Sequence, residues 1–341
     1  MRTSDFDYHL PPELIAQAAR LRGTSRLVVL RRDSGQVSLD RVSSLPALLR
    51  PGDLLLLNDV KVIPARIRAR RPGGGDAELL LVRPLGASDW EVMARPAKRL
   101  RVGVELALAR GGAIPRERLG EGTWRVEFVP ALDEAALAAV GEVPLPPYIR
   151  RPDGPSEADR ERYQTVYAKK GRAVAAPTAG LHFTPELLEA FGDRGVEIAR
   201  LTLHVGPGTF KPVQADDPAE HRLDPEDYEV TEATARALNR AQAAGRRIVC
   251  VGTTACRALE HALASGRGRV LPGAARADLF IRPGYRFRGT GALLTNFHLP
   301  RSTLLMLVSA LAGRERVLAE YSIAVRERFG FYSFGDAMLI L

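Results

Sequence analysis

The sequence predicts an α/β body interrupted by an inserted, mostly antiparallel β-barrel. Strand and helix patterns alternate in the first part of the chain and again after residue 150, which favours an at least partly parallel sheet. Between these parts, short apolar runs separated by glycine and proline replace the alternation, as in small all-β barrels. The 341 residues suffice for two domains. We therefore predict a discontinuous α/β domain (1–65 and 150–341) around a barrel domain (66–149).

The first element of the body is a short amphipathic pattern at residues 12–20, which predicts a helix. Apolar runs at 26–31 and 53–57 follow it. Runs of this length without helical spacing predict buried strands.

The predicted barrel contains short apolar runs at 77–83, 90–94, 104–109 and 124–129. Glycine-rich turns separate them and helical spacing is nearly absent, so we predict strands. A helix is predicted at 133–140. The proline-rich stretch 144–155 that follows is predicted to be a stiff linker back to the body.

The second part of the body begins with Thr184, a capping residue before a proline, which predicts a helix over 186–194. Gly245 is a suitable end for a helix over 231–244. The remaining expected elements are strands at 196–205 and 247–251 and helices at 253–264, 302–312 and 315–329.

The composition excludes several classes of protein. The two cysteines, Cys250 and Cys256, match neither a metal knuckle nor a redox motif, so we expect no disulfide scaffold and a reducing cytoplasm. The first residues lack an apolar signal core, and no apolar stretch reaches the ~20 residues of a membrane helix. We therefore expect a cytoplasmic protein without a membrane.

The net charge is +9, which favours polyanionic partners such as nucleic acid. Most of the 49 basic residues are arginine, and an arginine-rich proteome would give the same balance. Charge alone therefore leaves nucleic-acid binding open.

Three histidines follow strands or small-residue loops where helices begin: His182, His204 and His298. Such junctions are where α/β folds place ligand sites. Any one of them alone would more often be a hydrogen-bonded core residue. Together they predict a functional role for at least one.

Gly252, Thr253 and Thr254 stand between a strand and a helix, with Arg257 one turn later. Free backbone N–H groups and an arginine at this place suit a carboxylate or phosphate. No dinucleotide-binding or P-loop sequence occurs, so hydride transfer and P-loop phosphoryl transfer are disfavoured.

Other chemistry-bearing residues permit two readings each. His221, Asp224 and Glu226 could chelate a cation, but a solvated acidic loop is the stronger interpretation, and we expect no metal. Tyr163 and Tyr167 lie beside basic residues and could stack on RNA. An amphipathic helix with basic ends would show the same residue pattern. Asp336, an acid in an apolar segment, is either a cap or a functional carboxylate. From the residues alone the reaction class does not follow.

Taken together, these loops resemble the S-adenosylmethionine:tRNA ribosyltransferase-isomerases of queuosine biosynthesis, nearly end to end. The resemblance rests on DFDY (5–8), LND (57–59), VIPAR (62–66), PLPPYI (144–149), YQTVYA (163–168), AAPTAGLHFT (175–184), LHVG (203–206), GTF (208–210), GTT (252–254), FI (280–281), PGY (283–285), TNFHLP (295–300), STLLM (302–306) and GDAML (335–339). Two positions depart from the family pattern. Asp224 stands where a second histidine is usual, and Gly330 stands where an arginine is common.

The resemblance implies transfer and isomerisation of the ribosyl part of S-adenosylmethionine onto 7-aminomethyl-7-deazaguanine in tRNA. The products would be epoxyqueuosine-tRNA, adenine and methionine. It also implies an α/β body with an inserted barrel, no metal or organic cofactor, no obligate protein partner and a monomer.

This chemistry needs a base for the proton beside the sulfonium, a proton donor for adenine and a neutral attacking amine. We expect His182 or His298 to be the base, oriented by Asp336 or Asp59. Arg257 is expected to hold the methionine carboxylate. The expected substrate-binding residues, including those beside Arg257, are Thr178, Gly180, His204, Asn296, Thr253, Thr254 and Tyr163.

Two other functions remain open on the sequence. A catalytically silent RNA-binding protein would bind tRNA without releasing adenine. A small-molecule α/β enzyme would bind nucleic acid with only a weak salt dependence, whereas phosphate contacts give a steep one.

Overall fold

The α/β body is built on one mixed sheet in the computed structural model, which describes residues 1–120, 122–206, 213 and 215–341. Neighbouring strands are parallel from β13 to β17 and again between β18 and β1, and antiparallel elsewhere. This confirms the predicted α/β class. The order is β16 (Gly273–Ala277), β14 (Glu226–Val230), β13 (Glu197–Leu203), β3 (Leu54–Asn58), β15 (Ile248–Val251), β17 (Thr290–Asn296), β18 (Ala337–Ile340), β1 (Arg26–Leu30), β2 (Val37–Arg41).

The central strand β3 is apolar throughout because both faces of the sheet are covered. Leu54 and Leu56 pack into the core on one face, and Leu55 and Leu57 into the core on the other, as the two-residue period of a strand requires. The first face is covered by α5 (Glu232–Ala243), α6 (Thr253–Ser265), α7 (Thr303–Ala312) and α8 (Arg314–Arg326). The second is covered by α1 (Leu45–Leu48) and α4 (Pro185–Asp193).

Hydroxyl side chains cap three of the helices, including the one that Thr184 was expected to begin. Thr184 Oγ1 accepts from the Leu187 N–H at 3.1 Å, Thr231 Oγ1 from Thr234 at 3.2 Å and Ser302 Oγ from Leu305 at 3.2 Å. Each bond satisfies one of the backbone donors that a helix leaves free in its first turn. The predicted helices over 186–194, 231–244, 253–264, 302–312 and 315–329 are confirmed with shifts of one to three residues at their ends.

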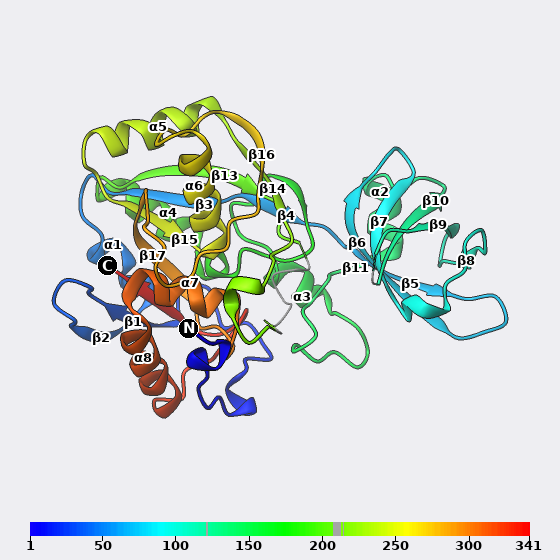
Figure 1. Cartoon of the computed structure of the whole chain (residues 1–341), viewed down its shortest axis with the longest axis horizontal. Helices are drawn as coiled ribbons and strands as arrows, with labels where there is room; N and C mark the ends of the chain where they lie inside the picture. Colours follow the sequence, from blue (N-terminus) through cyan, green and yellow to red (C-terminus); the bar gives the residue numbers. More distant parts are fainter. Residues whose placement is uncertain (121, 207–212, 214) are drawn as a thin grey trace.

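The barrel is a separate antiparallel sheet, at the right of Figure 1. Arg70 pairs with Ala107, which closes the sheet on itself, and Trp90, Trp124 and Phe128 fill its core. Asp133 caps the helix α2 (Glu134–Val140), as predicted. The strand order is β11 (Gly141–Glu142), β5 (Arg66–Arg70), β6 (Asp76–Pro84), β7 (Asp89–Arg95), β10 (Thr123–Val129), β9 (Gly112–Arg118), β8 (Leu106–Ala107).

Short elements join the barrel to the body. β4 (Val60–Val62) pairs in parallel with β12 (Lys170–Ala173) beside the start of the barrel. The helix α3 (Glu157–Arg162) lies in the segment that leads from the barrel back to β12. The 3₁₀ helices are η1 (Thr3–Phe6), η2 (Pro12–Leu14), η3 (Val42–Ser44), η4 (Ala97–Arg99), η5 (Thr178–His182) and η7 (Pro218–Glu220).

Some expectations from the sequence are wrong. Residues 12–20 form only the turn η2, because the backbone after it pairs with Phe331: the Ala16 N–H donates to Phe331 O, and the Phe331 N–H to Leu14 O. The stretch 144–155 is not a plain linker, since Leu145 is buried in a cluster with Tyr163 and Phe334. The run 104–109 yields only the two-residue strand β8. The boundaries 65/66 and 149/150 stay a prediction.

Candidate active site

A cavity lies where the parallel strands of the body end. β13, β3, β15 and β17 run in one direction, so the segments after them meet at one edge of the sheet, the usual ligand position in α/β folds. With its open mouth the cavity encloses about 570 Å³. Its lining residues are Tyr148, Ala175, Ala176, Pro177, Thr178, Ala179, Val205, Gly252, Thr253, Thr254, Thr295, Asn296, Phe297, His298, Leu304, Tyr332 and Ser333.

The lining contains neutral groups. Among the described residues that line it there is no aspartate, glutamate, lysine or arginine. Threonine hydroxyls and the Asn296 amide offer hydrogen bonds, and the partly exposed rings of Tyr148 and Tyr332 offer aromatic surface. Such a cavity suits a ligand with planar groups and a positive charge that aromatic rings can stabilise.

The start of α6 forms one wall. Gly252 has φ +88°, which glycine adopts without strain, and turns the chain from β15 into the helix. Asn58, at the end of β3, holds this corner: its Nδ2 lies 3.1 Å from Leu203 O and 3.4 Å from Thr254 Oγ1. The first backbone N–H groups of α6 have no partner within the helix, so they are available to an anionic group.

His298 lies in the cavity wall just after β17. Its Nε2 is 3.2 Å from Thr295 Oγ1 and its Nδ1 is 3.3 Å from the Tyr321 hydroxyl. Burial lowers the pKa of His298 to about 3, so the ring is neutral at pH 7 and can accept a proton.

His182 lies behind the cavity and not in its lining. Its Nδ1 is 2.9 Å from Ser25 Oγ, and its Nε2 is 3.3 Å from Asn296 Nδ2. Burial, with smaller contributions from Arg22 and Arg162, lowers the pKa of His182 to about 4. This ring is therefore also neutral at pH 7, and it reaches the cavity only through Asn296.

The two expected orienting carboxylates have other partners. Asp59 accepts from the Thr202 hydroxyl at 2.6 Å. Asp336 is fully buried and accepts from the backbone N–H groups of Arg26 and Gly330, each at 2.8 Å, beside Arg20 Nε at 3.5 Å. The expectation that one of them orients a histidine is thus wrong in this structure: hydroxyls and an amide contact both rings. At Gly330, where the family commonly has arginine, the backbone holds Asp336.

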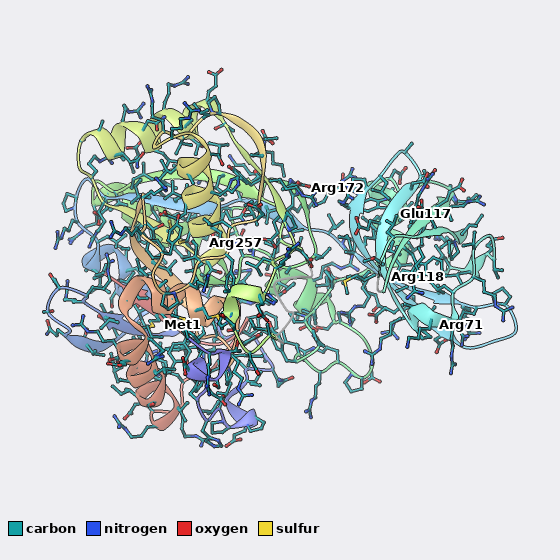
Figure 2. All side chains as sticks on the ribbon, viewed as in Figure 1. Met1, Arg71, Glu117, Arg118, Arg172 and Arg257 are labelled. Atoms are coloured by element: carbon teal, nitrogen blue, oxygen red, sulfur yellow. The ribbon has the colours of Figure 1, made fainter. Side chains whose placement is uncertain are left out.

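Arg257 lies inside the body (Figure 2) and is not among the residues that line the cavity. Its Nη1 lies 2.9 Å from Glu226 Oε2, and both side chains are buried. The structure therefore gives Arg257 a protein carboxylate in place of the expected methionine carboxylate. It also corrects the interpretation of Glu226 as part of a solvated acidic loop, because Glu226 begins the buried strand β14.

His204 lies in a second hollow, a groove between the barrel and the body, together with Asp224. Its Nδ1 accepts from the Arg172 N–H at 3.1 Å, and the Arg172 guanidinium lies 5.5 Å from the centre of the Trp90 ring in the barrel. Figure 2 shows Arg172 on the side of the body that faces the barrel. His204 is thus separate from the cavity, and residues 207–212 of the loop after it lie outside the described residues.

Two further expected binding residues belong to the core. Tyr163 is fully buried with its ring edge against Phe334, so it cannot stack on an RNA base in this conformation. Gly180 is buried where a Cβ atom would overlap the Tyr167 hydroxyl, and therefore only glycine fits there. Of the expected set, Thr178, Thr253, Thr254, Asn296 and His298 line one cavity; their roles stay a prediction.

Several lining residues were not expected from the sequence. Tyr148 and Tyr332 pack edge to face with ring centres 4.0 Å apart, and the Tyr148 hydroxyl lies 2.5 Å from Ser333 Oγ. Tyr332 has φ +72°, an uncommon backbone conformation for a large side chain. The prolines before Tyr148 hinted at a rigid segment, but no sequence signal marks Tyr332. No cluster of potential metal ligands occurs among the residues that the structure describes, and no helix in that part of the chain has the length and apolar character to span a membrane.

Comparisons with known proteins agree with this arrangement. A family model described as "Queuosine biosynthesis protein" matches residues 3–340. An S-adenosylmethionine:tRNA ribosyltransferase-isomerase of Geotalea uraniireducens is 51% identical, with all of both chains covered. One from Thermus thermophilus is 50% identical over 98% of each chain.

A solved structure is also similar to this chain over its whole length. The S-adenosylmethionine tRNA ribosyltransferase of Thermotoga maritima matches with a TM-score of 0.56 and 38% identity, covering 99% of this chain and all of its own. The match runs over the body and the barrel together. The chain therefore belongs to the family of queuosine biosynthesis proteins, whose curated members are named S-adenosylmethionine:tRNA ribosyltransferase-isomerase.

Proposed function

We propose that this protein transfers and isomerises the ribosyl moiety of S-adenosylmethionine onto 7-aminomethyl-7-deazaguanine in tRNA. The products are epoxyqueuosine-tRNA, adenine and methionine. The observation that carries the proposal is the cavity at the strand ends, with neutral hydrogen-bonding groups, aromatic walls and a neutral histidine, in a chain that matches these enzymes along its whole length.

The cavity suits the cosubstrate in three respects. The aromatic rings of Tyr148 and Tyr332 can stabilise the positive sulfonium and pack against adenine. The free N–H groups at the start of α6, beside Thr253 and Thr254, suit the methionine carboxylate in place of Arg257. The absence of acidic side chains among the described lining residues leaves the sulfonium without a strong ion pair, which keeps it reactive.

His298 is the proposed base, since of the two candidate histidines only His298 lines the cavity. The positive sulfur acidifies the C5′–H bond, and the lone pair of a neutral imidazole takes that proton. Adenine then leaves with the electrons of its bond to the sugar and needs a proton. The neutral aminomethyl nitrogen of the base in tRNA forms the new bond to the sugar-derived carbon and loses a proton. Methionine leaves with the electrons of its C5′–S bond as the sugar ring rearranges.

The tRNA is proposed to reach this cavity from the face between barrel and body. The groove there carries Arg83, Arg172 and Arg276, which can contact phosphates. We further propose that the protein works as a monomer in the cytoplasm, with S-adenosylmethionine as a cosubstrate and no additional cofactor.

The test is turnover with purified protein, S-adenosylmethionine and tRNA that carries 7-aminomethyl-7-deazaguanine. Nucleoside mass spectrometry after digestion should show epoxyqueuosine, and free adenine should appear in equal amount. A matched tRNA that lacks the aminomethyl group is the control and should give no modified nucleoside.

Two outcomes would overturn the proposal. If tRNA binds but neither product forms, the protein is an RNA-binding relative without catalysis. If tRNA does not bind and binding to other nucleic acids depends only weakly on salt, a small-molecule substrate becomes the better explanation.

A further inference from the structure

The Asn296 side chain has an orientation that its neighbours dictate. It is 98% buried at the end of β17, and its Nδ2 lies 3.1 Å from the Tyr332 carbonyl oxygen and 3.3 Å from His182 Nε2. A carbonyl oxygen can only accept a hydrogen bond, so the nitrogen of the amide must face Tyr332. Oδ1 is therefore on the opposite side, and it has no hydrogen-bond partner among the described residues.

This geometry also fixes the proton on His182. Both hydrogens of Asn296 Nδ2 have acceptors, one on Tyr332 and one on His182, so Nε2 of the histidine must accept. The ring proton is then on Nδ1, which donates to Ser25 Oγ at 2.9 Å. The charged groups that face the ring are Arg22 and Arg162, which disfavour a second proton.

The Tyr332 carbonyl is itself held in place. Tyr332 has φ +72°, a conformation that is strained for a non-glycine residue and persists only where its neighbours hold it. Its N–H donates to Phe297 O at 3.1 Å, and its carbonyl also accepts from the Gly335 N–H at 2.9 Å. These bonds direct the carbonyl at Asn296. Asp336 holds the same loop, because its carboxylate accepts from the Gly330 N–H.

A buried acceptor without a partner is destabilising, and a ligand with a matching donor recovers this loss. Asn296 lines the cavity together with the partly exposed aromatic residues Tyr148 and Tyr332. Planar heterocycles with an N–H donor on one edge fit such a place, because the rings take the flat faces and the acceptor takes the edge.

We propose that Asn296 Oδ1 accepts a hydrogen bond from the N–H edge of a planar base in the cavity, and that His182 is a positioning residue that keeps the amide in this orientation. The inference rests on the proposed function for the identity of the base. Two bases of that reaction carry such an edge: the adenine of S-adenosylmethionine and the 7-deazaguanine of tRNA.

The first experiment compares two variants of His182 in the full-length protein. In His182→Gln an amide oxygen replaces Nε2 as the acceptor, so the KM values for both substrates should stay within about threefold of the wild type. In His182→Leu the amide loses one restraint, and the KM for the substrate that provides the base should rise about tenfold, with a smaller change in kcat. The pH profile of His182→Gln should match that of the wild type.

The second experiment concerns Asn296 itself. Asn296→Asp keeps an acceptor but loses both donations, to His182 and to Tyr332, so binding should weaken tenfold or more at pH 8. Calorimetry with S-adenosylmethionine alone identifies adenine as the partner if its Kd rises. An unchanged Kd together with a raised KM for tRNA identifies the 7-deazaguanine.

The controls separate binding from folding. Val29→Ala removes core volume on β1, away from the cavity, and should lower the free energy of unfolding without altering either KM. If His182→Leu does not fold, Ser25→Ala tests the same network, since it frees the ring proton to move to Nε2 and should raise the same KM.

The inference is overturned if His182→Gln loses activity as strongly as His182→Leu, or if the loss falls on kcat with an altered pH profile, because His182 would then transfer protons. Wild-type affinity in Asn296→Asp would overturn it as well. Wild-type protein without turnover would instead count against the proposed function.

Discussion

The barrel and the α/β body use polar side chains in opposite ways. In the described part of the barrel, no charged, amide, hydroxyl or histidine side chain is buried; its core is apolar and its charges pair across the outer face. The body buries Asp59, His182, Glu226, Arg257 and Asp336 among other polar residues. Buried polar groups are costly unless each finds a partner, so they fix one arrangement of their neighbours.

This difference shows which region of the molecule tolerates substitution and which does not. An apolar core tolerates substitutions that conserve volume, whereas a hydrogen-bonded network does not. The cavity lies within the network, at the strand ends of the body. The barrel can therefore vary in its surface without disturbing the site, and changes in the buried network should affect function or folding strongly.

The largest expected effect is on catalysis. His298→Ala should lower kcat/KM about 10²- to 10⁴-fold, the usual contribution of a general base. Adenine release under single-turnover conditions measures it. Arg116→Ala in the barrel is the matched control and should turn over like the wild type. Turnover in His298→Ala within a factor of three of the wild type would remove this residue from the mechanism.

The next effect is on stability. Arg257→Met removes one member of the buried Arg257–Glu226 ion pair, and breaking one side of a buried pair costs about 3–5 kcal/mol. Urea unfolding measures the loss. The double variant Arg257→Met/Glu226→Met should recover much of it. Full stability with a weakened Kd for S-adenosylmethionine would instead restore the original expectation that Arg257 holds the substrate carboxylate.

Acid should destabilise the body in a graded way. Burial lowers the pKa of His182 to about 4 and of His298 to about 3, whereas in the unfolded chain both titrate near 6.5. Between pH 6.5 and 4 the unfolded state binds protons that the folded state does not, so the free energy of unfolding falls as the pH falls. Each histidine contributes up to about 1.4 kcal/mol per pH unit.

Urea unfolding between pH 7 and 4.5 measures this slope, and the double variant His182→Gln/His298→Gln should show a shallower one. The segment 66–149 contains no histidine, so a probe on Trp90 or Trp124 reports the barrel without this contribution. An unchanged slope in the double variant would show that these two histidines do not cause the pH dependence of stability.

The smallest effect belongs to the barrel surface. Arg116 Nε lies 2.7 Å from Glu127 Oε2, but both side chains are partly exposed. Arg116→Ala should cost about 0.2–1 kcal/mol, and less in high salt. A loss of stability as large as that of Arg257→Met would show that an exposed ion pair on the barrel matters as much as the buried pair in the body.

Much of the fold could be predicted from periodicity and caps. Thr184 caps a helix as expected, because a capping hydroxyl acts locally, and Thr231 and Ser302 cap the helices that periodicity predicts after them. The helix at 12–20 failed because its backbone pairs with Phe331, more than three hundred residues later, which local pattern cannot reveal. The strands β17 and β18 were missed for a similar reason, since their pairing partners are distant in sequence.

The candidate site likewise has a part that the sequence predicts and a part that it does not. Thr178, Thr253, Thr254, Asn296 and His298 lie together because the ends of parallel strands meet, a rule that sequence reasoning can use. The partners of the buried charges could not be predicted. Asp336 could bind a histidine or backbone N–H groups, and only the packed chain selects the second. Tyr332 carries no signal, because tyrosine does not favour a positive φ.

The place of β18 in the sheet has a consequence for biosynthesis. This strand follows the other described strands in chain order, yet it lies between β17 and β1 and joins them. As the ribosome releases the chain from its amino end, β1 and β2 must wait for residues Ala337–Ile340 before they can join the rest of the body. Asp336, immediately before β18, also secures the loop that carries Tyr332. A nascent chain therefore completes its cavity only once β18 has been made, and a chain truncated before Ala337 should lack the strand that joins β1 to β17.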